Sequence, residues 1–220
     1  MEITYDLLRH SEEINTYIRQ ADASLEALGF TEHSFAHVAK CAKQAADLLA
    51  ELGYPARTAE LARIAGYPHD IGNVVNRVDH AHSGAIMAFR LLDKLGMPPE
   101  ETAAVITAIG NHDEETAYPV NELAAALILA DKSDVRRSRV RSKDTIAFDI
   151  HDRVNYAVER SALKLDKEAK TITLELEIDS SICPILEYFE IFMTRMLLCR
   201  KAAAFFDLRF GIVINGQIMM

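Results

Sequence analysis

Six side chains in this sequence are candidate ligands for a transition metal. A neutral imidazole beside an ionised carboxylate, as in His69-Asp70, supplies two ligands from adjacent positions. Histidine nitrogens with few carboxylates and no thiolate favour Fe, Mn, Co, Ni or Zn over Mg or Ca. A metal held in this way lowers the pKa of a bound water and polarises a phosphoryl oxygen, and Asp70 is placed to bridge two metals if two bind. The candidate ligands are His37, His69, Asp70, His80, His112 and Asp131.

These residues predict a metal site only as a set. A single histidine on an amphipathic helix is more often a surface or core residue than a ligand, and Asp131 alone would be interpreted as a solvated helix end. A lone buried aspartate is costly unless it pairs or coordinates a metal, which favours the joint interpretation. A second pair, His151-Asp152, shows that the dipeptide also arises without such companions, and we interpret it as part of a polar helix face.

Each candidate ligand lies near the end of a predicted helix, as expected where a bundle builds a metal site from facing helices. Apolar residues recur at helical spacing, and Gly53 and Gly96 follow two of these runs as C-caps. Pro68 is expected to end the third helix, and the apolar run 123–130 to form a central one. The predicted helices cover about residues 5–28, 34–52, 58–67, 80–95, 98–112, 121–131 and 144–160.

The pattern changes after residue 160. Alternation with period two in residues 162–165 and 171–178, around a polar turn, predicts a β-hairpin. A long helix over about 182–206 and a short strand over 209–214 follow. We therefore expect a mainly α protein with a small C-terminal α+β appendage packed on its helical body. The two predicted domains are a helical metal-binding domain, 1–160, and the appendage, 161–220.

The composition indicates a soluble cytoplasmic protein. Half of the residues are hydrophobic, which supports a sizeable core, and the net charge of −9 argues against a nucleic-acid polymer or an anionic membrane as partner. The N-terminus lacks a signal pattern, and no apolar run is long enough to span a bilayer. The widely spaced cysteines have no CxxC motif and are expected to be reduced, buried thiols. They are Cys41, Cys183 and Cys199.

The order of the candidate ligands forms a further pattern. His37, then His69-Asp70-Ile-Gly72, then Asp131 follow the order H…HD…D, and His80-Ala-His-Ser-Gly84-Ala85 has the form H-x-x-x-G-A. With Asn111-His-Asp-Glu114 as a further histidine element, this set resembles the two-metal members of the HD-domain metal-dependent phosphohydrolase superfamily over about residues 31–134. The resemblance implies an HD-domain helical bundle. It also implies a first metal at His37, His69, Asp70 and Asp131, and a second at Asp70, His80 and His112.

The sequence departs from that family at two points. The family often has a lysine after the glycine of HDIG, in contact with substrate phosphate, whereas Asn73 stands there; Arg77, one turn further on, could replace the lysine. The histidine doublet and Gly-Tyr-Pro of the cyclic-di-nucleotide branch are also absent, since Asn111-His112 and Ala117-Tyr-Pro119 occupy those places. Cyclic di-GMP hydrolysis is therefore not expected.

For two of the ligand positions, the sequence offers a second histidine nearby. His33 competes with His37, but residues 40–42 take the place of the family's usual basic-apolar-Ala step and favour His37. Because the two histidines are four residues apart on one helix, both could face the metal, with His33 as a substrate contact. His82 competes with His80, and the spacing to the following Gly-Ala pair favours His80.

A basic run follows Asp131 directly. Guanidinium groups suit bidentate phosphate recognition, although the same run could be a solvated face that pairs with acids. The candidate substrate-binding residues are Arg77, Arg136, Arg137, Arg139 and His33, with Arg141 also in the run. The candidate catalytic residues are Asp70, Lys132 and Asp134, the last two for phosphate contact and proton transfer.

These features predict a metal-dependent phosphohydrolase that acts on a small phosphate ester, expected to be a nucleotide, through metal-activated water. The cofactor would be one or two divalent transition metals (Fe, Mn, Ni, Co or Zn). An alternative of another class is a non-hydrolytic, metal-bound nucleotide sensor, which Asn73 favours; a weaker one is a di-iron oxygenase-like HD protein. The aromatic and methionine stripe of the last helix is expected to be core or the seam of a homodimer.

Overall fold

The computed structural model describes residues 2–114, 116–147 and 149–219. The chain divides into two compact units, residues 1–131 and 132–220, while the domains 1–160 and 161–220 stay a prediction. The mainly helical fold with a C-terminal α+β region is confirmed. None of the described helices is long and apolar enough to cross a lipid bilayer.

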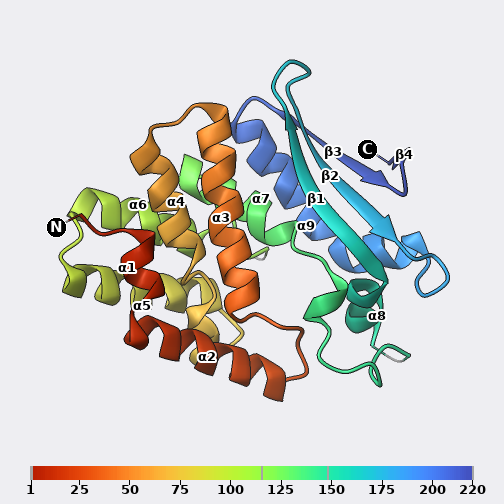
Figure 1. The fold of residues 1–220 in the computed structure, drawn as a ribbon, viewed down its shortest axis with the longest axis horizontal. Helices are drawn as coiled ribbons and strands as arrows, with labels where there is room; N and C mark the ends of the chain where they lie inside the picture. The colour runs from red at the N-terminus through yellow and green to blue at the C-terminus, as the bar shows by residue number, and fades with distance from the viewer. Residues whose placement is uncertain (1, 115, 148, 220) are drawn as a thin grey trace. The chain divides into compact units, whose positions relative to one another are not determined.

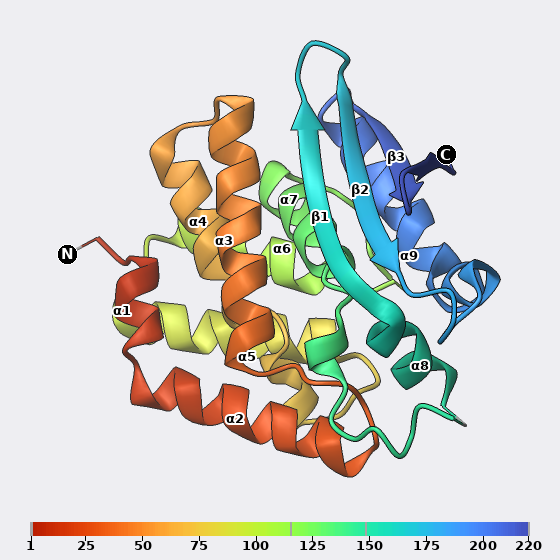
Figure 2. The same cartoon turned by 45° about the vertical axis from the view of Figure 1, so that its right-hand side comes forward.

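The first unit is a helical bundle whose helices largely follow the predicted ranges (Figures 1 and 2). Gly53 and Gly96 end two helices with positive φ values of 88° and 81°, a conformation that glycine adopts without strain. The elements are α1 (Tyr5–Arg9), α2 (Glu12–Ala27), α3 (Phe35–Leu52), α4 (Ala56–Gly66), the 3₁₀ helix η1 (Ile71–Val74), α5 (His80–Leu95), α6 (Pro99–Gly110) and α7 (Glu122–Lys132), which crosses into the second unit.

The first predicted helix, over 5–28, is two helices. Ser11 has extended backbone, and its hydroxyl accepts a hydrogen bond from the amide of Ile14 at 3.4 Å, so it caps a new helix. Glu12 and Glu13 in the first turn interact favourably with that helix terminus. The cap therefore overrides the apolar periodicity that predicted one continuous helix.

Close backbone packing brings the helices of the metal-site residues together. A Cβ added to Gly66 would lie 2.7 Å from the Cα of Ala42, so α4 approaches α3 closely at this point. A Cβ added to Gly72 would lie 1.9 Å from the carbonyl oxygen of His80, so the start of η1 rests on the first turn of α5. As predicted, α4 ends before Pro68. The run 123–130 of α7 is fully buried, as expected for a central helix.

The second unit contains a four-stranded mixed sheet in the order β1-β2-β3-β4. Strands β1 and β2 form the predicted antiparallel hairpin, α9 connects β2 to the parallel strand β3, and β4 pairs with β3 (Figures 1 and 2). Alternate residues of β2 are buried, and α9 packs on β2 and β3. The elements are η2 (Arg137–Arg139), α8 (Ile150–Ala157), β1 (Val158–Asp166), β2 (Thr171–Ile178), α9 (Ile185–Phe205), β3 (Arg209–Ile214) and β4 (Gln217–Ile218).

The predicted helix over 144–160 is shorter than expected at both ends. Asp149 caps α8, since its carboxylate accepts hydrogen bonds from the amides of His151 and Asp152. The helix stops at Ala157 because Val158 pairs with Ile178 and begins β1. Within this unit His151 is exposed, whereas the buried Asp152 carboxylate accepts a hydrogen bond from the hydroxyl of Thr145. This second His-Asp pair thus has a local structural role.

Candidate metal centre

Asp70 lies between two pairs of buried histidines. Its Oδ2 atom is 3.6 Å from Nε2 of His37 and 3.4 Å from Nε2 of His69. Its Oδ1 atom is 3.4 Å from Nε2 of His80 and 3.7 Å from Nε2 of His112. One oxygen therefore faces each pair, as a carboxylate does when it bridges two metals.

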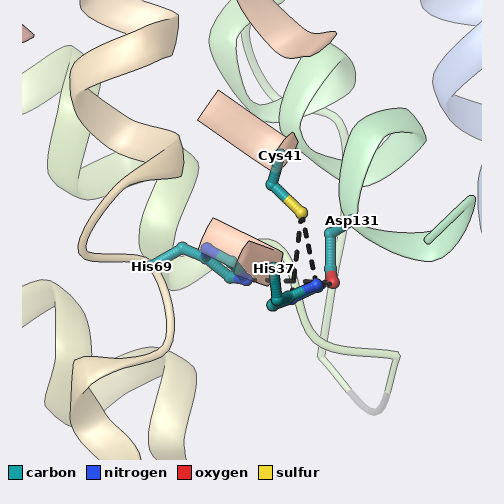
Figure 3. Close-up of side chains that lie close together, drawn as sticks. All are labelled: His37, Cys41, His69 and Asp131. Atoms are coloured by element: carbon teal, nitrogen blue, oxygen red, sulfur yellow. Dashed lines mark hydrogen bonds and ion pairs between the residues drawn. The ribbon is translucent and has the colours of Figure 1, made fainter. Parts of the chain in front are cut away.

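Asp131 joins His37 and His69, and together they form the first ligand group. The Oδ1 atom of Asp131 is 3.3 Å from Nε2 of His37 and 3.8 Å from Nε2 of His69. Figure 3 shows His37 and Asp131 side by side, with Cys41 next to both and His69 pointing toward them. One ligand atom from each of these four side chains lies within 4.8 Å of the others. Two ligands on one metal, each about 2.0–2.3 Å from it, stand about 3–3.8 Å apart, so the observed spacing suits a shared ion.

Three of the histidines are held so that Nε2 faces the centre. In each, Nδ1 lies at hydrogen-bond distance from the backbone carbonyl oxygen three residues earlier, so Nδ1 carries the proton and Nε2 presents its lone pair. Such backbone partners fix the tautomer and the ring orientation of metal-ligating histidines. The pairs are His69 with Gly66 at 2.9 Å, His80 with Arg77 at 3.0 Å, and His112 with Ile109 at 2.6 Å.

The electrostatics of the centre favour a cation. Burial opposes a positive charge on His69, but the carboxylates of Asp70 and Asp131 outweigh it and raise the pKa of His69 to about 10. Burial also opposes a negative charge on Asp70, but the surrounding histidines, above all His69, hold the pKa of that carboxyl well below its usual range. The carboxylates thus stabilise positive charge among the imidazoles, either as a proton or as a metal ion.

An unpartnered atom supports the same conclusion. Nε2 of His69 is buried and makes no hydrogen bond within the described part of the chain, which would ordinarily cost about 1–3 kcal/mol. Carboxylate oxygens of Asp70 and Asp131 lie 3.4 Å and 3.8 Å from it, but neither has the geometry of a hydrogen bond. A metal ion would satisfy this nitrogen and both carboxylates at once, so the residues fit the metal that the sequence predicts.

The second ligand group consists of Asp70, His80 and His112. Beside it, the side chains of Asn73 and Arg77 form a chain of hydrogen bonds that starts at Asp70. The side-chain nitrogen of Asn73 donates to the backbone oxygen of Asp70 at 2.9 Å and to its Oδ1 atom at 3.2 Å. The side-chain oxygen of Asn73 then accepts a bond from Arg77 at 3.3 Å, and the same guanidinium nitrogen lies 3.3 Å from Nε2 of His80. Asn73 therefore orients Asp70, and Arg77 places a cationic group at the edge of the centre.

A comparison with families of known proteins identifies the family of the chain. The profile of the HD domain matches residues 34–173, which is more than half of the chain. The chain belongs to the HD-domain family. Among solved structures it is similar to a predicted HD superfamily hydrolase from an uncultured Thermotogales bacterium, with 28% sequence identity, a TM-score of 0.46, and coverage of 58% of this chain and 69% of that chain. A comparison with curated proteins gives no match.

The structure distinguishes the histidines that were alternatives for two of the ligand positions. His37 is fully buried beside Asp70 and Asp131, whereas His33, with Nδ1 2.6 Å from the backbone oxygen of Thr31, is partly exposed. The rings of the two lie edge to face at 5.4 Å. His80 is buried at the centre, and His82 is exposed near Asp79. His37 and His80 thus lie in the buried cluster around Asp70, and their roles as metal ligands stay predictions.

Two residues near the HD ligands were not predicted. Asp113 has one carboxylate oxygen 3.9 Å from both His80 and Arg77, and its place directly after His112 was the available signal. Cys41 was interpreted only as a reduced thiol and the site as free of sulfur, but its sulfur lies within the first ligand group. Its spacing of four residues from His37, one helical turn, could have revealed it.

The remaining candidate residues belong to the second unit. Lys132 and Asp134 are buried, and Asp134 accepts a hydrogen bond from Arg136 at 3.0 Å. Arg139, also buried, donates to the backbone oxygen of Asp134 at 2.8 Å, and Arg137 donates to that of Tyr156 at 2.6 Å. These contacts order the start of the second unit. The roles of Lys132 and Asp134 in catalysis and of the arginines in substrate binding stay predictions.

Proposed function

We propose that this HD-domain protein is a metal-dependent phosphohydrolase that cleaves a small phosphate ester, with nucleotides as the first substrate class. The observation that carries the proposal is the placement of Asp70, with one carboxylate oxygen toward His37 and His69 and the other toward His80 and His112. When bound, divalent metals at such a centre supply a water of lowered pKa and withdraw charge from a phosphoryl oxygen.

The chain's own residues would orient the metal ligands and bind the substrate. Asp70 and the anchored histidines hold their lone pairs in fixed directions, which lowers the cost of organising the site for each reaction. Arg77 places a guanidinium nitrogen 3.3 Å from Nε2 of His80, and its fork suits an anionic phosphoryl group. Asp113, 3.9 Å from Arg77, limits where that side chain can lie.

The direct test is a screen of nucleoside mono-, di- and triphosphates, phosphodiesters and a generic aryl phosphate with added Mn²⁺ or Co²⁺. We expect phosphate release that depends on the metal and is abolished in Asp70→Ala. The variant Asp93→Ala is the matched control, because Asp93 is an exposed carboxylate on α5 and should leave turnover unchanged. Equal turnover in Asp70→Ala and wild type would contradict the proposal.

Asn73 also supports a second candidate, a non-hydrolytic nucleotide sensor. Its amide group is buried and bonded to Asp70, so it does not offer the mobile cation that the family often has at this place. In the same screen, a nucleotide that binds tightly to the metal-loaded wild type without being cleaved would favour the sensor. Metal-dependent turnover would favour the hydrolase.

A further inference from the structure

The thiol of Cys41 is part of the first ligand group. Cys41 lies one turn after His37 on α3, so both side chains leave the same face of the helix. Its sulfur is 3.6 Å from Nδ1 and 3.7 Å from Nε2 of His37, and both residues are fully buried. Figure 3 shows the sulfur turned toward His37 and Asp131.

The sulfur of Cys41 lies beside the imidazole ring of His37, about equally close to its two nitrogens, and its distance to Nε2 is near that between two ligands of one metal. A sulfur at about 2.3 Å and an imidazole nitrogen at about 2.0–2.1 Å from a tetrahedral metal lie about 3.6 Å apart, close to the 3.7 Å between Sγ and Nε2 of His37. The unpartnered, fully buried Nε2 of His69 belongs to the same group of four atoms. This nitrogen is an independent sign that the group is arranged to hold a cation.

The other cysteines behave differently. Cys183 and Cys199 are buried cysteines as well, but within the described part of the chain neither belongs to a group of three or more potential metal ligands. Cys183 lies instead near the carboxylate of Glu187. Burial of a thiol in this protein therefore does not by itself place it in a ligand group, and Cys41 is distinguished by its neighbours.

We propose that the Cys41 thiolate is a ligand of the metal held by His37, His69 and Asp131; this inference rests on the metal centre of the proposed function. On metal binding the S–H bond breaks heterolytically, the proton passes to the buffer, and the sulfur electron pair binds the metal, with no change of oxidation state. Because thiolates select soft and borderline metals, this half of the centre prefers Zn, Co or Fe over Mn and Mg. The half formed by Asp70, His80 and His112 has only nitrogen and oxygen donors, so the two halves differ in metal preference.

The test is absorption spectroscopy of the full-length protein reconstituted with Co²⁺ alone. Cobalt bound by histidine and carboxylate gives visible d–d bands, and a thiolate ligand adds a near-ultraviolet charge-transfer band. We expect both features in wild type. In Cys41→Ala the charge-transfer band is lost while the d–d bands persist. The variant Cys199→Ala removes a buried thiol outside the group and keeps both. Cys41→Ser, which retains a small polar side chain, replaces Cys41→Ala if that variant does not fold.

A titration in which Co²⁺ and Mn²⁺ compete for the protein gives a second readout. Removing a residue that hydrogen-bonds to a metal ligand costs about 10–100-fold in metal affinity. Removing the thiolate ligand itself in Cys41→Ala should therefore lower the preference of the site for Co²⁺ over Mn²⁺ by at least about tenfold. Visible bands without a charge-transfer band in wild type would overturn the assignment of Cys41 and leave the metal centre intact. A charge-transfer band that survives in Cys41→Ala would also overturn it. Absence of bound cobalt in wild type would overturn both this inference and the metal centre.

Discussion

At the scale of single residues, the clustering of the candidate ligands could be predicted because their types and order restrict the chemistry. Recognising imidazoles and carboxylates in the order of the HD pattern requires no knowledge of how the chain packs. Cys41 and Asp113 were missed because a lone cysteine is most often a small core residue, and because an aspartate after a histidine has no defined direction. Whether such a side chain faces a site depends on helix phase and on neighbours distant in the sequence.

Arg77 provides a prediction at this scale. If its guanidinium binds the phosphoryl group, Arg77→Gln should lose a charge-assisted bond worth about 1.5–3 kcal/mol, or about 10–100-fold in kcat/KM. The measurement is steady-state kinetics on the best substrate from the screen, with binding calorimetry if that ligand is not cleaved. Metal content should stay at the wild-type level.

The control for Arg77 is Arg90→Gln, which removes an exposed arginine on α5. It should leave both kinetics and binding unchanged. Loss of metal together with activity in Arg77→Gln would show instead that Arg77 holds the centre together.

At the scale of elements, local signals predicted most helices but not every boundary. Gly53, Gly96 and Pro68 act through their own backbone preferences, so the helices that they end were predicted closely. The start of β1 at Val158 depends on pairing with Ile178, a contact that no local pattern contains. Strand boundaries of this kind are set by the partner strand.

Helices α4 and α6 are joined by an ion pair with a predictable pH dependence. Arg57 donates hydrogen bonds to both carboxylate oxygens of Glu101 and to the backbone oxygen of Ile3. The hydrogen bond from Arg57, against a smaller effect of burial, lowers the pKa of Glu101 from its ordinary value. The carboxylate therefore stabilises the fold above its unfolded-state pKa, and this contribution is lost as pH falls through the folded-state pKa.

The side chains of Arg57 and Glu101 are 22% and 24% exposed, so we expect Glu101→Gln to cost about 0.5–1 kcal/mol of unfolding free energy at neutral pH. The difference from wild type should vanish in acid, once the carboxyl is protonated. Urea unfolding of chelator-treated protein measures it, with the exposed neighbour variant Glu100→Gln as control. A cost that is equal at both pH values would rule out the ion pair as its cause.

At the scale of the whole molecule, the order of most element types was predictable from the sequence. The hairpin, the long helix and the final strand follow from periodicity alone. The parallel pairing of β2 with β3 across α9 and the boundary between residues 131 and 132 arise from contacts that are distant in sequence. A small phosphorylated substrate and a homodimer stay predictions.

The central claim is that the helical unit holds metal through Asp70. Elemental analysis of purified protein, before and after incubation with Fe, Mn, Co, Ni or Zn salts and desalting, measures it directly. We predict about one or two equivalents in wild type, loss of metal in Asp70→Ala, and a reduced content in His80→Ala. The variant His82→Ala should retain the wild-type content because His82 is exposed. Metal-free wild type under every condition, or full retention by Asp70→Ala, would contradict the account.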